Sequence, residues 1–295
     1  MKKVGFYLVK WWVDFQSIQP FWLLYLKSDL LYLLVYHVVR YRRKVVRCNL
    51  LRSFPEEDLK SLKVIEKQFY CNLCDLMVEA PKMMQMGENG YRKRISFVNK
   101  ELVEQLANKG KNVFYAIPHS GNWEWFGKMI PEFAEHKGLA IYKKVKSPLF
   151  EQLMLYMRTK NCSLEMVESN SVLRRLMELR NNHNGVLMMA DQTSHGLATD
   201  YWTEFLHQDT CWFTGIERIA KKLDYAIVFI SMTRKSRGHY EIVFELVTDT
   251  PKEMKDGEIM ERYVRCVERF ILANPDNWLW SHRRWKHERP EIIDA

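Results

Sequence analysis

A histidine and a glutamate stand five positions apart in "PHSGNWE", residues 118–124. The motif follows the apolar run 113–117, which is typical of a buried strand, and it opens a segment with helical spacing. A turn at 120–122 could return Glu124 to the imidazole of His119, where a carboxylate on one ring nitrogen fixes the tautomer and leaves the other as a general base. The same spacing also suits a histidine that caps a strand end beside a solvated glutamate.

The elements around this motif alternate between strand-like and helix-like patterns. Apolar runs that predict strands lie at 113–117, 139–142, 185–190, 225–232 and 242–247. Helical periodicity lies at 121–136, 148–160, 169–182 and 213–223, and a longer helix is predicted from Ser53 and Pro55 through Leu76. The alternation predicts an α/β fold, with a central mixed sheet flanked by helices. Residues 1–50 are predicted to be a helical appendage to one domain, 51–295.

The N-terminal segment 18–39 is apolar and long enough to cross a bilayer. Lys27 and Asp29 stand in its middle, and each would cost a few kcal/mol at the bilayer centre. We therefore expect two short helices, broken at 27–29, that lie in the membrane interface. The adjoining "RYRRKVVR", residues 40–47, adds basic side chains worth about 1 kcal/mol each near an anionic leaflet. A buried hairpin followed by a solvated basic turn is the alternative.

Composition restricts the partners and the chemistry. The net charge of +9 favours anionic lipid, nucleic acid or a small acidic protein. Nucleic acid is disfavoured, because the basic residues stand beside apolar stretches and form no reading motif. The six cysteines are scattered, as in a reduced chain, and the lone pair Cys71 and Cys74 is a weak metal or redox signal. No serine or cysteine stands in a nucleophile-elbow pattern, so no acyl-enzyme is expected.

Five ordered blocks resemble the late acyltransferases of lipid A biosynthesis, the lauroyl/myristoyl transferase family, over nearly the whole chain. "YRRKVVRCNLLRSFPE" is similar to the family's basic block after its N-terminal anchor. "HSGNWEW" resembles its H-x4-D/E motif, and "LAIYKKVKSPLFEQLMLYMRTKN" resembles the segment that ends at an essential arginine. "GVLMMADQTSHG" resembles its D-Q-D-x-G loop, and "NPDNWLWSHRRWK" its C-terminal block.

The resemblance implies a lysophospholipid-acyltransferase-like fold. It also implies transfer of a fatty acyl chain from a thioester on acyl carrier protein to a hydroxyl of a lipid A precursor. The expected place is the cytoplasmic face of the inner membrane, with peripheral or monotopic attachment or a single N-terminal anchor. The expected partners are an anionic membrane and a lipid acceptor, and no metal or other cofactor is expected. Carried onto this sequence, the catalytic residues are His119, Glu124, Arg158 and Asp191. The expected substrate-binding residues are Asn122, Lys143, Lys144, Lys146, Gln192, Arg283 and Arg284.

Each step of such a reaction has a candidate group in the sequence. His119 would take the proton of the attacking hydroxyl, with Glu124 orienting its ring. Backbone N–H groups of the Gly121 turn, or the cation of Arg158, could stabilise the oxyanion. The lysines of 143–146 and the arginines of the C-terminal block could hold phosphates.

Two departures from the family pattern leave the acceptor open. Thr193 replaces the second acid of the D-Q-D-x-G loop, and "YKKVKSP" has lysines where the family has Tyr-Arg-Pro. Lysine lacks the bidentate fork of arginine, so it holds a phosphate more loosely. A lysophospholipid or an aminolipid is therefore an alternative acceptor, and a catalytically silent membrane-surface scaffold is the alternative from another class.

Overall fold

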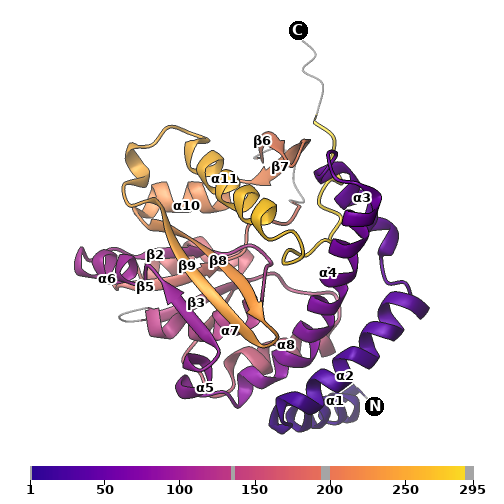
Figure 1. The fold of residues 1–295 in the computed structure, drawn as a ribbon. Helices are drawn as coiled ribbons and strands as arrows, with labels where there is room; N and C mark the ends of the chain where they lie inside the picture. The colour runs from indigo at the N-terminus through magenta and orange to yellow at the C-terminus, as the bar shows by residue number, and fades with distance from the viewer. Residues whose placement is uncertain (1, 134–136, 194–199, 290–295) are drawn as a thin grey trace.

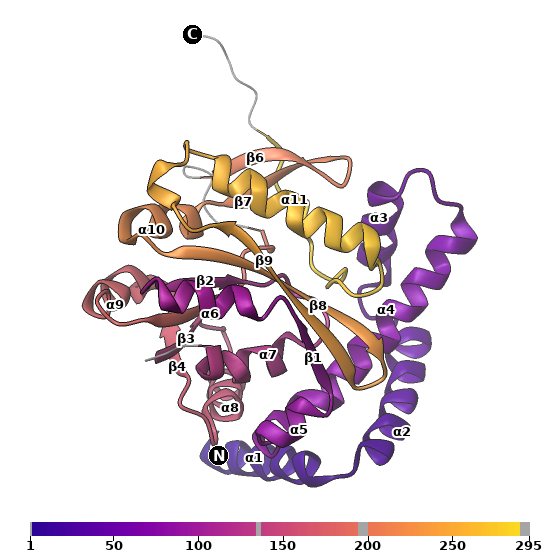
Figure 2. The same ribbon diagram turned by 60° about the vertical axis from the view of Figure 1, so that its left-hand side comes forward.

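The computed structural model describes residues 2–133, 137–193 and 200–289. Its centre is a seven-stranded mixed sheet of order β1-β9-β8-β2-β5-β3-β4 (Figures 1 and 2). The strands are β1 (Ile95–Val98), β2 (Val113–Ala116), β3 (Lys137–Tyr142), β4 (Glu165–Glu168), β5 (Asn184–Met188), β8 (Ala226–Ser236) and β9 (His239–Thr248). β8, β2, β5, β3 and β4 are parallel, whereas β9 pairs antiparallel with β8 and parallel with β1. The predicted α/β fold with a mixed sheet is confirmed.

Helices cover both faces of this sheet because its central strands are apolar on both sides. Alternate side chains of β2 point to opposite faces, so Phe114 and Ala116 lie in one core and Val113 and Tyr115 in the other. The flanking helices are α4 (Leu59–Glu79), α5 (Glu88–Arg92), α6 (Glu101–Asn108), α7 (Trp123–Met129), α8 (Pro148–Thr159), α9 (Val172–Glu178), α10 (Gly215–Leu223) and α11 (Glu258–Ala273).

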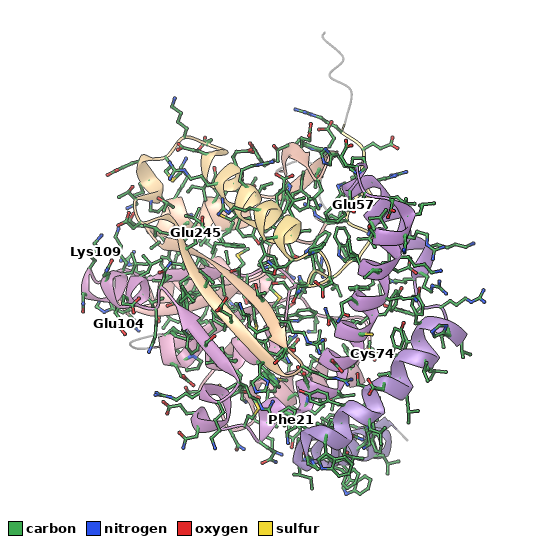
Figure 3. All side chains as sticks on the ribbon, in the orientation of Figure 1. Phe21, Glu57, Cys74, Glu104, Lys109 and Glu245 are labelled. Carbon is green, nitrogen blue, oxygen red and sulfur yellow. The ribbon has the colours of Figure 1, made fainter. Side chains whose placement is uncertain are left out.

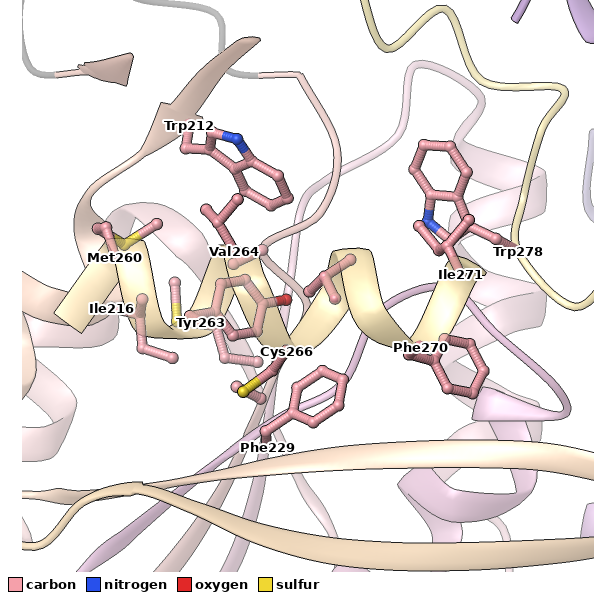
Figure 4. Close-up of a cluster of buried hydrophobic side chains, with 14 of the residues drawn as sticks. Trp212, Ile216, Phe229, Met260, Tyr263, Val264, Cys266, Phe270, Ile271 and Trp278 are labelled. Carbon is pink, nitrogen blue, oxygen red and sulfur yellow. The ribbon is translucent and has the colours of Figure 1, made fainter. Parts of the chain in front are cut away.

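Helix α11 supplies many side chains of the core that contains Phe114 and Ala116. Figure 4 shows Tyr263 and Val264 of this helix between Trp212 and Phe229, which come from β7 and β8. β7 (Gln208–Phe213) forms a separate antiparallel hairpin with β6 (Asp200–Phe205). Every strand predicted from an apolar run is present. The short strands β1 and β4, the hairpin and α11 were not predicted.

The long predicted helix is α4, but it begins later than expected. Asp58 caps it by accepting a hydrogen bond of 2.7 Å from the backbone N–H of Ser61. The predicted start at Ser53 is wrong, because Ser53 ends the preceding helix α3 (Arg43–Ser53). Cys74 faces inward from α4 (Figure 3), and burial raises the pKa of its thiol to about 12. A thiol with so high a pKa stays protonated and unreactive.

The N-terminal helices are α1 (Lys2–Ile18) and α2 (Phe21–Tyr32), and α2 continues into the π-helical turn η1 (Leu33–Val38). The predicted break at 27–29 is wrong, since α2 runs through it and the chain bends at Pro20 instead. The Lys27 ammonium group donates to the side chains of Gln16, over 3.0 Å, and Gln19. Asp29 accepts a bond of 2.7 Å from Arg237. Because partners from outside α2 bond to both charged side chains, the helix can continue through residues 27–29 without a break.

The N-terminal helices pack on the rest of the protein by one side only. Phe21, labelled in Figure 3, has the Arg94 guanidinium 3.5 Å from its ring centroid, and α2 lies along α4. The stretch Phe21–Val38 is the part of the described chain whose length and apolar composition would suit a membrane span, and little of it is buried. Large apolar side chains stay exposed on the outer side, here called the N-terminal apolar surface: Tyr7, Leu8, Trp11, Trp12, Phe15, Ile18, Trp22, Leu26, Leu30, Leu33 and Leu34.

Candidate active site

His119 and Asp191 meet at the carboxyl edge of the parallel strands. His119 follows β2 and Asp191 follows β5, and these two strands are neighbours in the sheet. Loops after adjacent parallel strands emerge side by side, which is where open α/β sheets place their sites. The imidazole Nδ1 of His119 lies 2.7 Å from one carboxylate oxygen of Asp191, and the other oxygen accepts the His119 backbone N–H over 2.9 Å.

Asp191 is fixed and charged. It is only 1% exposed, and Trp278 donates its indole N–H to the carboxylate over 2.8 Å. Burial opposes the charge on Asp191, but the attraction and hydrogen bonds of His119 and the bond from Trp278 lower its pKa to about 2. An ionised Asp191 keeps a proton on Nδ1 of His119. The His119 side chain is 17% exposed, so Nε2 is left as the ring nitrogen for an external proton.

The sequence suggested that Glu124 orients His119, but in the structure Glu124 pairs with Arg158 instead. Asn122 starts α7, and the first turn of this helix directs Glu124 toward Arg158 in the last turn of α8. Arg158 donates from Nε over 2.9 Å and from Nη2 over 2.6 Å to the two carboxylate oxygens. Glu124 is 9% exposed, so this is a largely buried, bidentate ion pair. Burial lowers the pKa of Arg158, but the bonds and charge of Glu124 outweigh that effect and raise it.

Asn122 is a structural residue of the site rather than a surface for substrate. Its side chain is fully buried, accepts the backbone N–H of Trp125 over 3.2 Å and donates to Glu79 over 2.8 Å. Glu79 also accepts hydroxyl bonds from Tyr25 and Tyr240, and burial raises its pKa. This buried carboxylate fixes the turn that precedes α7. Sequence reasoning missed Glu79, because it stands in an ordinary helical pattern.

The turn between His119 and α7 requires glycine. Gly121 has φ +55°, and a Cβ there would lie 2.5 Å from the backbone oxygen of Met232. The backbone N–H of Gly121 donates to the Asn277 carbonyl over 3.2 Å, and that of Ser120 donates to Pro118 over 2.7 Å. Both groups are therefore engaged within the protein. They are poor candidates for the oxyanion donors that the sequence suggested.

The C-terminal segment closes one side of the site. The backbone N–H of Leu279 donates to the His119 carbonyl over 3.1 Å. Thr193 donates its backbone N–H to Nε2 of His282 over 3.2 Å and its hydroxyl to the Arg284 carbonyl over 2.7 Å. The residue that replaces the family's second acid thus attaches the Asp191 loop to the C-terminal segment. Gln192, between Asp191 and Thr193, is half-buried.

The cations expected to bind substrate are not gathered at His119. Arg284 is 1% exposed and lies 4.3 Å from the centroid of the Trp212 ring, so it packs inside the protein and cannot meet an external phosphate. Arg283 is exposed on the C-terminal segment. Lys143, Lys144 and Lys146 are exposed after β3, at the same edge of the sheet as His119, but β5 stands between β3 and β2.

A pocket with an apolar and a polar side adjoins the histidine. Trp123 packs edge-on against His119, with ring centroids 5.3 Å apart, and forms part of the pocket wall. The remaining wall comes from the Gly121 turn, the C-terminal segment, α4, β8 and β9. Its apolar side chains are Phe69, Leu73, Leu76, Trp123, Trp278 and Leu279, and its polar ones are Asn72, Arg234, Tyr240, Asp276 and Asn277. Nothing in the sequence indicated that α4 would line a pocket beside the histidine, because the two segments meet only through tertiary packing.

The buried imidazole of His282, which accepts the Thr193 backbone N–H, should make the protein less stable at acid pH. Burial lowers the pKa of His282 to about 4; Asp191 opposes this shift, and Arg284, His119 and Arg42 add to it. As the pH falls from 6.5 to 4, His282 therefore binds a proton in the unfolded chain but not in the folded chain, so the free energy of unfolding should fall. The variant His282→Gln should flatten this dependence in urea unfolding at several pH values. His239→Gln, at an exposed site, is the control, and equal slopes for wild type and His282→Gln would contradict the assignment.

Comparison with known proteins identifies the family. Residues 7–287 match the model of the bacterial lipid A biosynthesis acyltransferases. The chain is 18% identical over 257 residues to "Lipid A biosynthesis acyltransferase 2" of Shigella flexneri, covering 86% of this chain and 81% of that protein. It is 22% identical over 259 residues to a "Lipid A biosynthesis acyltransferase" of Haemophilus influenzae, covering 83% and 76%. The chain therefore belongs to the bacterial lipid A biosynthesis acyltransferase family and is an acyltransferase.

Proposed function

We propose that this protein transfers a fatty acyl chain from an acyl thioester to a hydroxyl of a lipid A precursor, with His119 as general base. The observation that carries the proposal is the bond between Asp191 and Nδ1 of His119, which leaves Nε2 for the substrate. The lipid A precursor as acceptor follows from the names of the related proteins.

The reaction needs no covalent bond to the enzyme. Nε2 of His119 takes the hydroxyl proton while the hydroxyl oxygen attacks the thioester carbonyl. The resulting tetrahedral intermediate expels the thiolate as the C–S bond breaks, and the imidazolium returns the proton to sulfur. Asp191 stabilises the imidazolium between these steps. The products are an ester and a free thiol, so atoms and charges balance.

Arg158 is the proposed source of positive charge for the oxyanion. Its Nε and Nη2 atoms bond to Glu124, which fixes the plane of the guanidinium group and leaves Nη1 for another acceptor. A cation fixed in advance stabilises developing negative charge without reorganisation. The engaged N–H groups of Gly121 and Ser120 make Arg158 the better candidate. Gln192 and Arg283 are proposed to contact polar groups of the acceptor.

The donor is proposed to be acyl carrier protein, with its acyl chain against the apolar side of the pocket beside Trp123. Phe69, Leu73 and Leu76 of α4 give this pocket an apolar wall. A small acidic carrier would be attracted by the net charge of +9. Acyl-CoA is the alternative donor.

The place of action is proposed to be the cytoplasmic face of the inner membrane. The N-terminal apolar surface exposes Trp11, Trp12 and Trp22, and tryptophan favours the membrane–water interface. The basic cluster at 40–47 directly follows this surface. Together they suit peripheral or monotopic attachment to an anionic leaflet.

A reconstituted assay tests the function. Purified protein receives acyl carrier protein or CoA thioesters together with a lipid A precursor, a lysophospholipid or an aminolipid, and mass spectrometry identifies the acylated product. We expect the lipid A precursor to gain one acyl ester, faster from the carrier protein than from CoA. Acylation of the lysophospholipid or aminolipid alone would replace the proposed acceptor. Transfer to none of the three would favour the scaffold.

A further inference from the structure

We propose that the segment 143–150, the loop after β3 together with the first residues of α8, is a second contact with the membrane surface, separate from the N-terminal helices. Val145, Leu149 and Phe150 are exposed, Phe150 to 52%, although large apolar side chains usually pack away from water. Lys143, Lys144 and Lys146 flank Val145 and precede Leu149 and Phe150, and they are also exposed. This inference rests on the membrane attachment included in the proposed function.

The three lysines carry charge that the described part of the protein leaves uncompensated. Lys143, Lys144 and Lys146 form no ion pair with any residue of the described ranges 2–133, 137–193 and 200–289. Anionic lipid headgroups complement such a cluster, while Val145, Leu149 and Phe150 can enter the boundary of the acyl region. Lysine also lets its methylene stem follow apolar side chains into that boundary.

The segment is continuous with the N-terminal apolar surface through α1 and α8. Asp14 of α1 accepts bonds of 2.7 Å from Tyr156 and from Lys160, at the carboxyl end of α8. The carboxyl ends of both helices also reach the 3-10 turn η2 (Ala80–Met84), where Lys82 donates to Ser17 and Asn161 to Met84.

Lys10, one turn before Asp14, lies 4.4 Å from the ring centroid of Tyr156, one turn before Lys160, so α1 and α8 run side by side in the same direction and their amino-terminal ends lie on the same side. The segment 143–150, at the start of α8, therefore lies on the side of the amino-terminal end of α1, which packs against α8. Tyr7, Leu8 and Trp11 of α1 belong to the N-terminal apolar surface. The segment and this surface can thus face one bilayer together.

The position of the segment gives the contact a function. It follows β3 at the carboxyl edge of the sheet, the edge that also carries His119 and Asp191. A second contact there would hold this edge against the bilayer, so that the hydroxyl of an embedded acceptor reaches His119 without leaving the membrane. The same lysines could instead bind phosphates of the acceptor itself, and the experiment must separate these two sources of negative charge.

The first test measures binding to vesicles. The triple variant Val145→Ser/Leu149→Ser/Phe150→Ser is compared with wild type on vesicles of phosphatidylcholine mixed with phosphatidylglycerol. We expect at least about tenfold weaker binding. The matched control Val98→Ser/Leu246→Ser/Leu272→Ser removes exposed apolar side chains of β1, β9 and α11 and should bind as wild type does. Unchanged binding of the first variant, or equal loss in the control, would overturn the proposal.

The second test measures activity with the acceptor in vesicles and in detergent micelles. The serine variant should turn over more slowly on vesicles and keep the wild-type rate in micelles. Lys143→Gln/Lys144→Gln/Lys146→Gln should weaken binding to the anionic vesicles and leave binding to neutral vesicles as it was. If this lysine variant instead binds anionic vesicles normally and raises KM for the acceptor in micelles, the lysines bind acceptor phosphate and the proposal is wrong. A wild-type protein inactive both on vesicles and in micelles would refute the proposed reaction, while the vesicle binding test would still decide this inference.

Discussion

Replacement of His119 by alanine should lower turnover by about 10²- to 10⁴-fold, the usual effect of losing a positioned base. This corresponds to roughly 3–5 kcal/mol of lost transition-state stabilisation. The fold should persist, because the ring contributes one partly exposed side chain and the backbone bonds of residue 119 to Asp191 and Leu279 remain. Initial rates of acyl transfer, with urea unfolding as the control for folding, measure both effects.

Asp191→Asn should be nearly as severe as His119→Ala. An amide cannot carry the charge that stabilises the imidazolium, and its NH₂ group would face Nδ1 and favour the wrong tautomer. Since the two residues act as one unit, the double variant should be little slower than His119→Ala alone. Full activity of His119→Ala, or an acyl group trapped covalently on the wild-type protein, would rule out this mechanism.

Arg158→Met should lower turnover by about 10²- to 10³-fold and also destabilise the protein. It removes the proposed oxyanion cation and leaves the buried carboxylate of Glu124 without its partner. Breaking a fully buried pair costs about 3–5 kcal/mol. Because the Arg158 side chain is 27% exposed, we expect about 1–3 kcal/mol here, measured by urea unfolding.

A second substitution separates the two effects of Arg158. In Arg158→Met/Glu124→Gln no charge is left unpaired, so much of the free energy of unfolding should return. Turnover should stay low, because the cation is still missing. Glu124→Gln alone keeps the cation and should lower turnover less than Arg158→Met does. If the double variant recovered turnover together with stability, Arg158 would serve only the fold.

The sequence predicted the elements that present the site. The apolar run before Pro118 placed His119 at the end of a buried strand, and the spacing after it placed Glu124 in the first turn of a helix. Both patterns are local, because the repeat of apolar side chains every two residues in a strand, or every 3.6 in a helix, involves only residues close together in the chain. The family blocks likewise singled out Asp191, which the structure brings onto the histidine. β4 was missed because a glutamate stands at each of its ends and leaves only two apolar residues, whereas β2, of the same length, is apolar throughout.

Contacts between distant segments were decided by the tertiary structure alone. Asp191 rather than Glu124 meets His119, because β5 is the neighbour of β2, and strand order leaves no trace in local pattern. Burial likewise removed Arg284 from the surface by stacking it on Trp212.

The N-terminal helices show the same division. The sequence of residues 18–39 alone shows an apolar stretch that contains two charged side chains. Whether those charges break the helix depended on Gln16 and Arg237, one from α1 and one from the turn between β8 and β9. A sequence determines which side chains need partners through their charge and polarity. The partner of each is chosen only when segments far apart in the chain pack together, because hydrogen bonds and ion pairs act over a few ångströms of space and not along the sequence.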